Sequence, residues 1–123
     1  MAKIQTAATY QQWRALLDNR HEKTIGNNTV IRAGTVYNSP DDQTGELAVE
    51  VFLHGNRIAA IRQDDSIQLW DGGWRSHTTK DRLTSLLRAT HPTNCLYQKN
   101  FEWYVTSPHT LQDIPFYNGM VLK

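Results

Sequence analysis

The fold is decided by the stretch Glu46-Leu47-Ala48-Val49-Glu50-Val51-Phe52-Leu53-His54-Gly55-Asn56-Arg57-Ile58-Ala59-Ala60-Ile61-Arg62. Its first half alternates, as expected of a strand with one buried face. The apolar positions of this alternation are Leu47, Val49, Val51 and Leu53. Gly55-Asn56 supplies the positive φ angles of a tight turn, so Arg57–Arg62 returns as an antiparallel strand. The stretch therefore predicts a hairpin at the centre of an antiparallel sheet.

Further strands are predicted on both sides of this hairpin. Upstream, Thr24–Arg32 is rich in β-branched residues and predicts one strand. Between them, Asn38–Gly45 consists of residues that favour turns and predicts a loop. Downstream, Asp64-Asp65 predicts a turn before a strand at Ser66–Trp70. These strands form a four-stranded meander.

Two short helices are predicted to cover the sheet. Thr9 and Gln12 have the spacing of a capping box, which starts a helix that ends at Asp18. Thr78 or Thr79 can cap a second helix that ends before His91-Pro92. The apolar stripe of the second helix consists of Leu83, Leu86 and Leu87.

The C-terminal third adds a hairpin and a last strand. Cys95–Gln98 and Phe101–Thr106 flank Lys99-Asn100 as the hairpin, and the last strand lies within Phe116–Leu122. The predicted fold is of the α+β class, an antiparallel β-meander packed against one or two short helices. Residues 1–123 have the length of a single domain.

Composition restricts the class of function. Thirteen Lys and Arg against twelve Asp and Glu give a net charge of +1, which argues against nucleic-acid binding by overall charge. The single cysteine, Cys95, cannot form an internal disulfide, and the N-terminal region lacks the apolar core of a signal peptide or membrane span. We therefore expect a cytoplasmic protein with no membrane partner.

The densest cluster of glycine, tryptophan, hydroxyl and basic side chains is Trp70-Asp71-Gly72-Gly73-Trp74-Arg75-Ser76-His77-Thr78-Thr79-Lys80-Asp81-Arg82. Lys80 and Arg82 are predicted in the first turn of the second helix, where the macrodipole favours anions. A phosphate or a partner's carboxylate would explain these cations, and so would pairing with Asp71 or Asp81. Trp74 follows a glycine pair and is predicted to be more exposed than Trp70. The candidate partner- or anion-binding residues are Trp74, Arg75, Thr78, Thr79, Lys80, Arg82 and, before the hairpin turn, His54.

Several motifs resemble small proteins encoded by tailed phages and mobile elements. They are Leu53-His54-Gly55-Asn56, Asp64-Asp65-Ser66-Ile67-Gln68-Leu69, the Gly-Gly-Trp-x-x-x-Thr-Thr-Lys-x-Arg pattern of residues 72–82, and the tail segments Phe101–Val105 and Pro115–Met120. The resemblance covers Ile25 to Leu122 and is weaker over the first helix and the Asn38–Gly45 loop. It implies a phage or mobile-element origin and brings no catalytic residues with it.

Little in the sequence points to catalysis. The five histidines, His21, His54, His77, His91 and His109, show no metal-ligand spacing, and no phosphate loop or nucleophile elbow is present. We expect no metal, no cofactor and no enzyme. An enzyme that pairs Cys95 with His54 or His91, or His54 with Glu50, is the weakest hypothesis.

The leading hypothesis is a non-catalytic phage-type accessory protein that binds and modulates a host or phage protein, for example an inhibitor of a defence system. The alternative is a nucleic-acid-binding module built on the Trp, Arg and Lys cluster. Arg57 and Arg62 would add charge, but in a regular strand they point to opposite faces. A homodimer is a further hypothesis, with an interface formed by Trp103, Tyr104, Phe116 and Tyr117.

Overall fold

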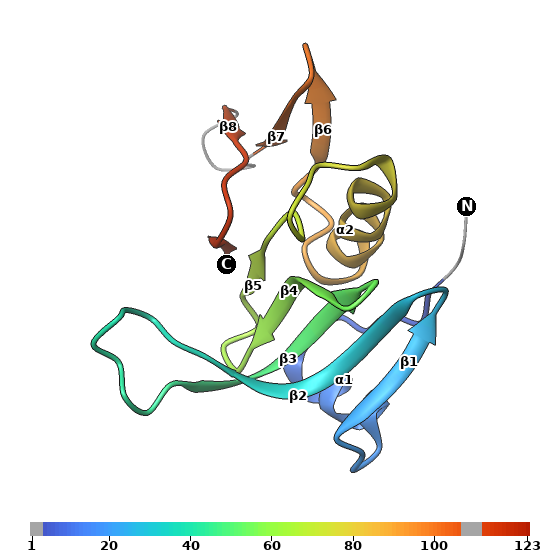
Figure 1. Ribbon diagram of the computed structural model, residues 1–123, viewed down its shortest axis with the longest axis vertical. Helices are drawn as coiled ribbons and strands as arrows, with labels where there is room; N and C mark the ends of the chain where they lie inside the picture. The colour runs from blue at the N-terminus through green and yellow to red at the C-terminus, as the bar shows by residue number, and fades with distance from the viewer. Residues whose placement is uncertain (1–3, 107–111) are drawn as a thin grey trace.

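The computed structural model, in which residues 4–106 and 112–123 are described, contains two antiparallel sheets and two helices (Figure 1). The larger sheet has the order β1-β2-β3-β4-β5-β9. Its strands are β1 (Glu22–Gly26), β2 (Thr29–Val36), β3 (Glu46–Leu53), β4 (Asn56–Arg62), β5 (Ile67–Leu69) and β9 (Met120–Leu122). The smaller sheet contains β6 (Leu96–Lys99), β7 (Glu102–Thr106) and β8 (Asp113–Pro115), and the helices are α1 (Tyr10–Leu17) and α2 (His77–Thr90). The α+β prediction is confirmed.

The central hairpin, β3–β4, turns through His54 and Gly55, whose φ angles are 51° and 81°. Two positive φ angles in a two-residue loop are typical of the tight hairpin turn that matches strand twist. Val51 pairs with Ala59 while Phe52 pairs with Arg57, so Ile58 is an extra residue and forms a β-bulge.

The predicted orientation of the two arginines of β4 is wrong, because the bulge changes which face of the sheet Arg57 points to. Arg57 contacts Glu50 at 3.0 Å, and Arg62 contacts Glu46 at 2.7 Å. Glu46 and Glu50 share one face of β3, so both arginines lie on that same face. The alternation had predicted opposite faces because it assumed a regular strand.

Several predicted boundaries also differ. Thr24–Arg32 is not one strand, because Asn28 has a φ of 51° and the chain reverses between β1 and β2. The meander therefore has five consecutive strands, and β9 extends the sheet beside β5. Leu47 is exposed, although its alternation partners on β3 are buried. The strand β8 was not predicted.

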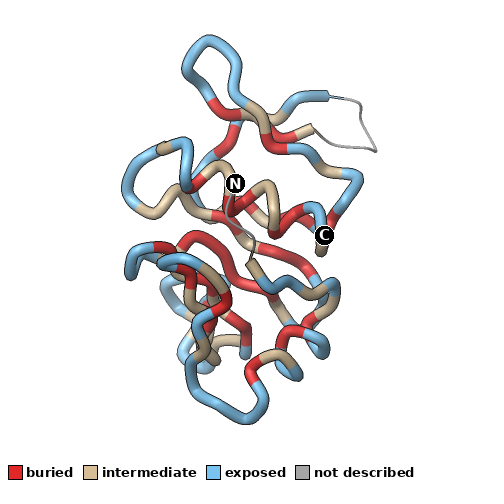
Figure 2. The backbone as a smooth tube through the Cα atoms, turned by 90° about the vertical axis from the view of Figure 1, so that its right-hand side faces the viewer, coloured by how far each residue is buried: buried red, intermediate tan, exposed pale blue. Residues whose placement is uncertain are grey.

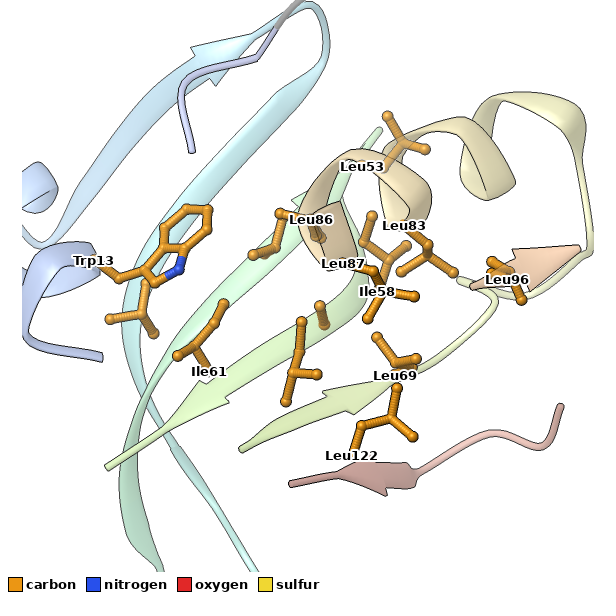
Figure 3. Close-up of a cluster of buried hydrophobic side chains, with 14 of the residues drawn as sticks. Trp13, Leu53, Ile58, Ile61, Leu69, Leu83, Leu86, Leu87, Leu96 and Leu122 are labelled. Carbon is orange, nitrogen blue, oxygen red and sulfur yellow. The ribbon is translucent and has the colours of Figure 1, made fainter. Parts of the chain in front are cut away.

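Both helices pack on the same face of the larger sheet. Trp13 of α1 and Leu86 of α2 belong to one continuous core with Ile61 of β4 (Figure 3). Figure 2 shows that buried residues concentrate in the central strands and helices, and exposed residues in the loops and hairpin tips. Burial of this single apolar face is the main stabilising contribution.

Helix α1 begins as predicted. Thr9 accepts a hydrogen bond from the Gln12 amide at 3.2 Å, and the Gln12 side chain accepts one from the Thr9 amide at 3.3 Å, which completes the capping box. Asp65, in the β4–β5 turn, accepts a further hydrogen bond from the Tyr10 amide at 2.7 Å. The start of α1 is thereby tied to the sheet.

Helix α2 is anchored by a buried arginine. Arg82, with 5% of its surface exposed, forms an ion pair with Asp81 at 3.0 Å. Its Nε donates to Thr29 Oγ1 at 3.0 Å, and its Nη2 donates to the Asn27 carbonyl at 3.4 Å. Arg82 therefore joins α2 to the β1–β2 turn.

We predict that Arg82→Ala lowers the free energy of unfolding by about 3–5 kcal/mol, because the substitution leaves the carboxylate of Asp81 without its buried cation. Urea denaturation followed by circular dichroism measures this loss. Arg88→Ala is the matched control on the exposed side of α2, and should cost less than about 1 kcal/mol. Equal losses in the two variants would contradict the anchoring role of Arg82.

A second prediction concerns His91 at the C-terminal end of α2. Burial lowers the pKa of His91 from its ordinary value of 6.5, and the charge of Asp65 opposes this only in part. Below about pH 6.5 the unfolded chain binds a proton that the folded chain does not, so the free energy of unfolding should decrease as pH falls from about 7 to 5.

Urea denaturation at several pH values should show a shallower decrease for His91→Gln, with a difference in slope of at most about 1.4 kcal/mol per pH unit. Two carboxylates with lowered pKa values do not interfere with this measurement. A hydrogen bond from the Gly45 amide lowers the pKa of Asp42 below 3.8, and one from the Ser66 hydroxyl lowers the pKa of Asp64 below 3.8. Their contribution to the free energy of unfolding is therefore lost only in solution more acidic than about pH 5. Identical slopes for the two proteins would refute this role of His91.

Candidate functional site

The loop between β5 and α2 approaches the β3–β4 hairpin closely. Gly72 has a φ of 74°, and a Cβ atom there would lie 3.1 Å from Ile58 Cγ2. Asp71 fixes the loop, because its amide donates to Asn118 Oδ1 at 2.8 Å and its carboxylate accepts from the Gly73 amide at 2.9 Å. The glycine pair thus permits both the backbone conformation and the close approach.

Ser76 caps α2, in place of the predicted Thr78 or Thr79. Its backbone is extended, with φ −93° and ψ 160°, and its Oγ accepts from the Thr79 amide at 3.1 Å. The hydroxyl of Thr79 is 2.9 Å from Ser76 Oγ and is buried, so it serves the cap, whereas Thr78 is exposed. Because the helix starts at His77, Lys80 lies in its first turn and Arg82 in the second.

These elements enclose a cleft of about 520 Å³. Its walls come from the β3–β4 turn, the β5–α2 loop and the start of α2. The lining residues are Leu53, His54, Asn56, Ile58, Gly72, Trp74, Ser76, Thr78 and Thr79. The cleft therefore brings together four of the predicted site residues, His54, Trp74, Thr78 and Thr79.

Trp74 stands at the edge of this cleft with 73% of its surface exposed. Trp70, by contrast, is half-buried and packs against the guanidinium of Arg57, which lies 3.9 Å from its ring centroid. The predicted difference between the two tryptophans is confirmed.

Arg75 is not among the residues that line the cleft, and it joins the loop to the smaller sheet. Its guanidinium contacts Glu102 at 3.3 Å and Asp71 at 3.7 Å, and it donates to the Phe116 carbonyl at 3.1 Å. It also lies 5.8 Å from the Trp103 ring centroid. These contacts fix the β6–β7 hairpin relative to Trp74.

The other predicted cations have partners within the protein too. Lys80 donates to Gln98 Oε1 at 3.3 Å, and Arg82 forms the buried anchor of α2. Arg57 and Arg62, which the alternative hypothesis added to the site, form ion pairs with glutamates. The electrostatic attraction of this region for an anion is therefore largely neutralised.

Phe101, at the tip of the β6–β7 hairpin, was missed as a site residue. The sequence predicted it as the start of a strand, but Asn100 and Phe101 form the turn, with φ angles of 52° and 68°. A left-handed conformation costs a residue with a side chain roughly 1–2 kcal/mol, and Phe101 gains no burial in return because 91% of it is exposed. The sequence did contain a signal. Two-residue hairpin turns favour Asn-Gly, and here Phe101 follows Asn100 in the position where that glycine is expected.

One ion pair joins the two segments that carry Trp74 and Phe101. Arg75 follows Trp74 in the chain, Glu102 follows Phe101, and the two charged groups are in contact. We use the name aromatic face for the exposed rings of Trp74 and Phe101 together with the cleft beside Trp74. Among the other exposed large apolar residues, Tyr37 and Leu47 belong to the β2–β3 segment. Tyr117 lies between Phe116 and Asn118, whose atoms accept hydrogen bonds from the loop that carries Trp74. The aromatics Trp103 and Phe116, proposed for a dimer interface, belong to the core instead.

The described residues place few titratable groups together. No cluster of three His, Cys, Asp or Glu side chains that could hold a metal occurs within residues 4–106 and 112–123. Glu50 is paired with Arg57, and Cys95 is exposed. His109 lies outside the described residues. No helix in this part of the chain is long and apolar enough to span a membrane.

Comparison with protein families gives one assignment. No curated protein and no solved structure matches the chain. The family model described as Kyanoviridae Gp96 protein matches residues 5–123, which include the first helix and the β2–β3 loop. This match confirms the phage origin that the resemblance implied. That the Gly-Gly-Trp-x-x-x-Thr-Thr-Lys-x-Arg pattern is characteristic of the family stays a prediction. Because the match covers nearly the whole chain, the protein belongs to the Kyanoviridae Gp96 family, a family of phage proteins.

Proposed function

We propose that this phage protein is a non-catalytic accessory protein that binds and modulates a host or phage protein through its aromatic face. The observation that carries the proposal is the exposure of Trp74 and Phe101, at 73% and 91%, in two segments that the Arg75–Glu102 ion pair joins. Aromatic residues are enriched in protein interfaces, and tryptophan is enriched among the few residues that carry most of the binding energy.

The ordered backbone that carries Trp74 and Phe101 supports this proposal. The backbone on either side of Trp74 is ordered by the Asp71 turn and by the Ser76 cap of α2, and the backbone of Phe101 lies in a two-residue turn. A backbone that is already ordered loses little further conformational entropy on binding. The cleft beside Trp74, with Leu53 and Ile58 in its wall, can receive an apolar side chain of the partner.

Nucleic-acid binding by the same surface has less support. Phosphate binding requires cations that are free to replace counterions. Arg75 and Arg82 are paired with carboxylates, so Lys80 is the one predicted cation here that lacks an ion pair among the described residues. A protein partner is the better match to exposed aromatic rings with neutralised arginines.

The proposal predicts that Trp74→Ala or Phe101→Ala weakens binding of the partner by about 30-fold or more, the effect of removing an interface anchor. The immobilised chain is incubated with lysate of a phage-infected host, with and without nuclease, and bound proteins are quantified by mass spectrometry. A specific partner should survive nuclease treatment and be lost with either variant.

Tyr37→Ala is the matched control, because Tyr37 is 59% exposed and lies on the β2–β3 segment. It should bind the partner like the unmodified protein. Retention of the partner by Trp74→Ala and Phe101→Ala, or its loss on nuclease treatment, would overturn the proposal. Circular dichroism should show unchanged folding for all three variants.

A further inference from the structure

A hollow of about 590 Å³ lies between α1 and the first strands of the larger sheet. In Figure 1 the α1–β1 connection is at the lower end of the molecule, whereas the β6–β7 hairpin is at the upper end. The buried Leu17 and half-buried Ala33 line the hollow, and the exposed side chains of Arg14, Arg20 and His21 surround them. It is a polar site with an apolar floor, separate from the aromatic face.

The arginines of this hollow differ from most others in the protein. Five arginines have a carboxylate within 4.0 Å, and they are Arg32, Arg57, Arg62, Arg75 and Arg82. Within residues 4–106 and 112–123, neither Arg14 nor Arg20 forms an ion pair or donates a side-chain hydrogen bond. The nearby Glu22 is occupied by Arg32 at 3.1 Å, and Asp18 does not line the hollow. The hollow is thus lined by two arginines that have no carboxylate partner among the described residues.

The C-terminal carbonyl groups of α1 do not bind the guanidinium groups of Arg14 and Arg20. Helix C-termini attract cations because their last carbonyl groups lack partners. Here three of these carbonyls have other donors: Ala15 from the Asp18 amide at 3.0 Å, Leu16 from Lys23 Nζ at 3.1 Å, and Leu17 from the Arg20 amide at 3.0 Å. The guanidinium groups of Arg14 and Arg20 therefore remain available to a ligand.

The backbone between α1 and β1, which carries Arg20, is ordered. Asp18 and Asn19 both adopt left-handed φ angles, 53° and 62°, which turn the chain back beside the helix. The carbonyl of His21 then accepts a hydrogen bond from the Ala33 amide at 2.9 Å, so the residue after Arg20 is fixed to β2. An ordered backbone at Arg20 lowers the entropy that a ligand must remove when it binds there.

We propose that this hollow binds the phosphate group of a nucleotide or of a single nucleic-acid strand. Guanidinium groups match phosphate oxygens with paired hydrogen bonds, and the amide of Gln11, which also lines the hollow, can donate a further one. The apolar floor at Leu17 and Ala33 offers a surface for a sugar or base. This site is independent of the proposed protein-binding function.

Isothermal titration of the full chain at low salt tests the site with three probes: inorganic pyrophosphate, a mononucleotide and a single-stranded oligonucleotide. Saturable binding is expected, and Arg14→Gln and Arg20→Gln should each weaken it roughly tenfold. For the oligonucleotide, the slope of log K against log salt should be about −1.4, the value for two phosphate contacts. Tighter binding of the oligonucleotide than of the mononucleotide identifies a strand as the ligand, and equal binding identifies a free phosphate ester.

Arg88→Gln is the matched control, because Arg88 is exposed on α2 and does not line the hollow. It should leave the affinity unchanged, and so should Trp74→Ala, which separates this proposal from that of the aromatic face. No saturable binding of any probe, or an equal loss with Arg88→Gln, would overturn the phosphate site.

Discussion

The extra residue at Ile58 is the constraint on which most of the structure depends. Because it shifts the register of β4 against β3 by one residue, Arg57 joins Arg62 on the face opposite the helices. The buried Ile58 side chain then meets the Gly72 backbone and forms part of the cleft wall. The same bulge therefore determines both the pairing of the sheet arginines and the position of the loop that carries Trp74.

Local patterns in the sequence predicted the elements well and their relations poorly. The alternation of β3, the capping box of α1 and the exposure of Trp74 each depend on neighbouring residues, so they could be read directly. The bulge at Ile58 and the join of β9 to β5 depend on contacts between distant segments. The exposure of Phe101 follows from its place in the β6–β7 turn. The one sequence signal for that place is Asn100, which is followed by Phe101 and not by the glycine usual in such turns.

Ion pairing explains why the segment that is densest in basic residues does not form a basic surface. Residues 71–82 carry their own carboxylates, so Arg75 and Arg82 act as ties between segments. Arg14 and Arg20, which no motif marked, remain without such partners among the described residues. Charge density along a sequence is therefore a weaker guide to a binding surface than the balance of charge in space.

The central claim is that the aromatic face contacts a protein partner, and photo-crosslinking in the infected host tests it most directly. A benzophenone amino acid is placed at position 101 or 74, or at position 37 as a control. The account predicts a covalent adduct with the same protein from positions 101 and 74, and none from position 37. Adducts formed equally from position 37, or from neither position of the aromatic face, would contradict it.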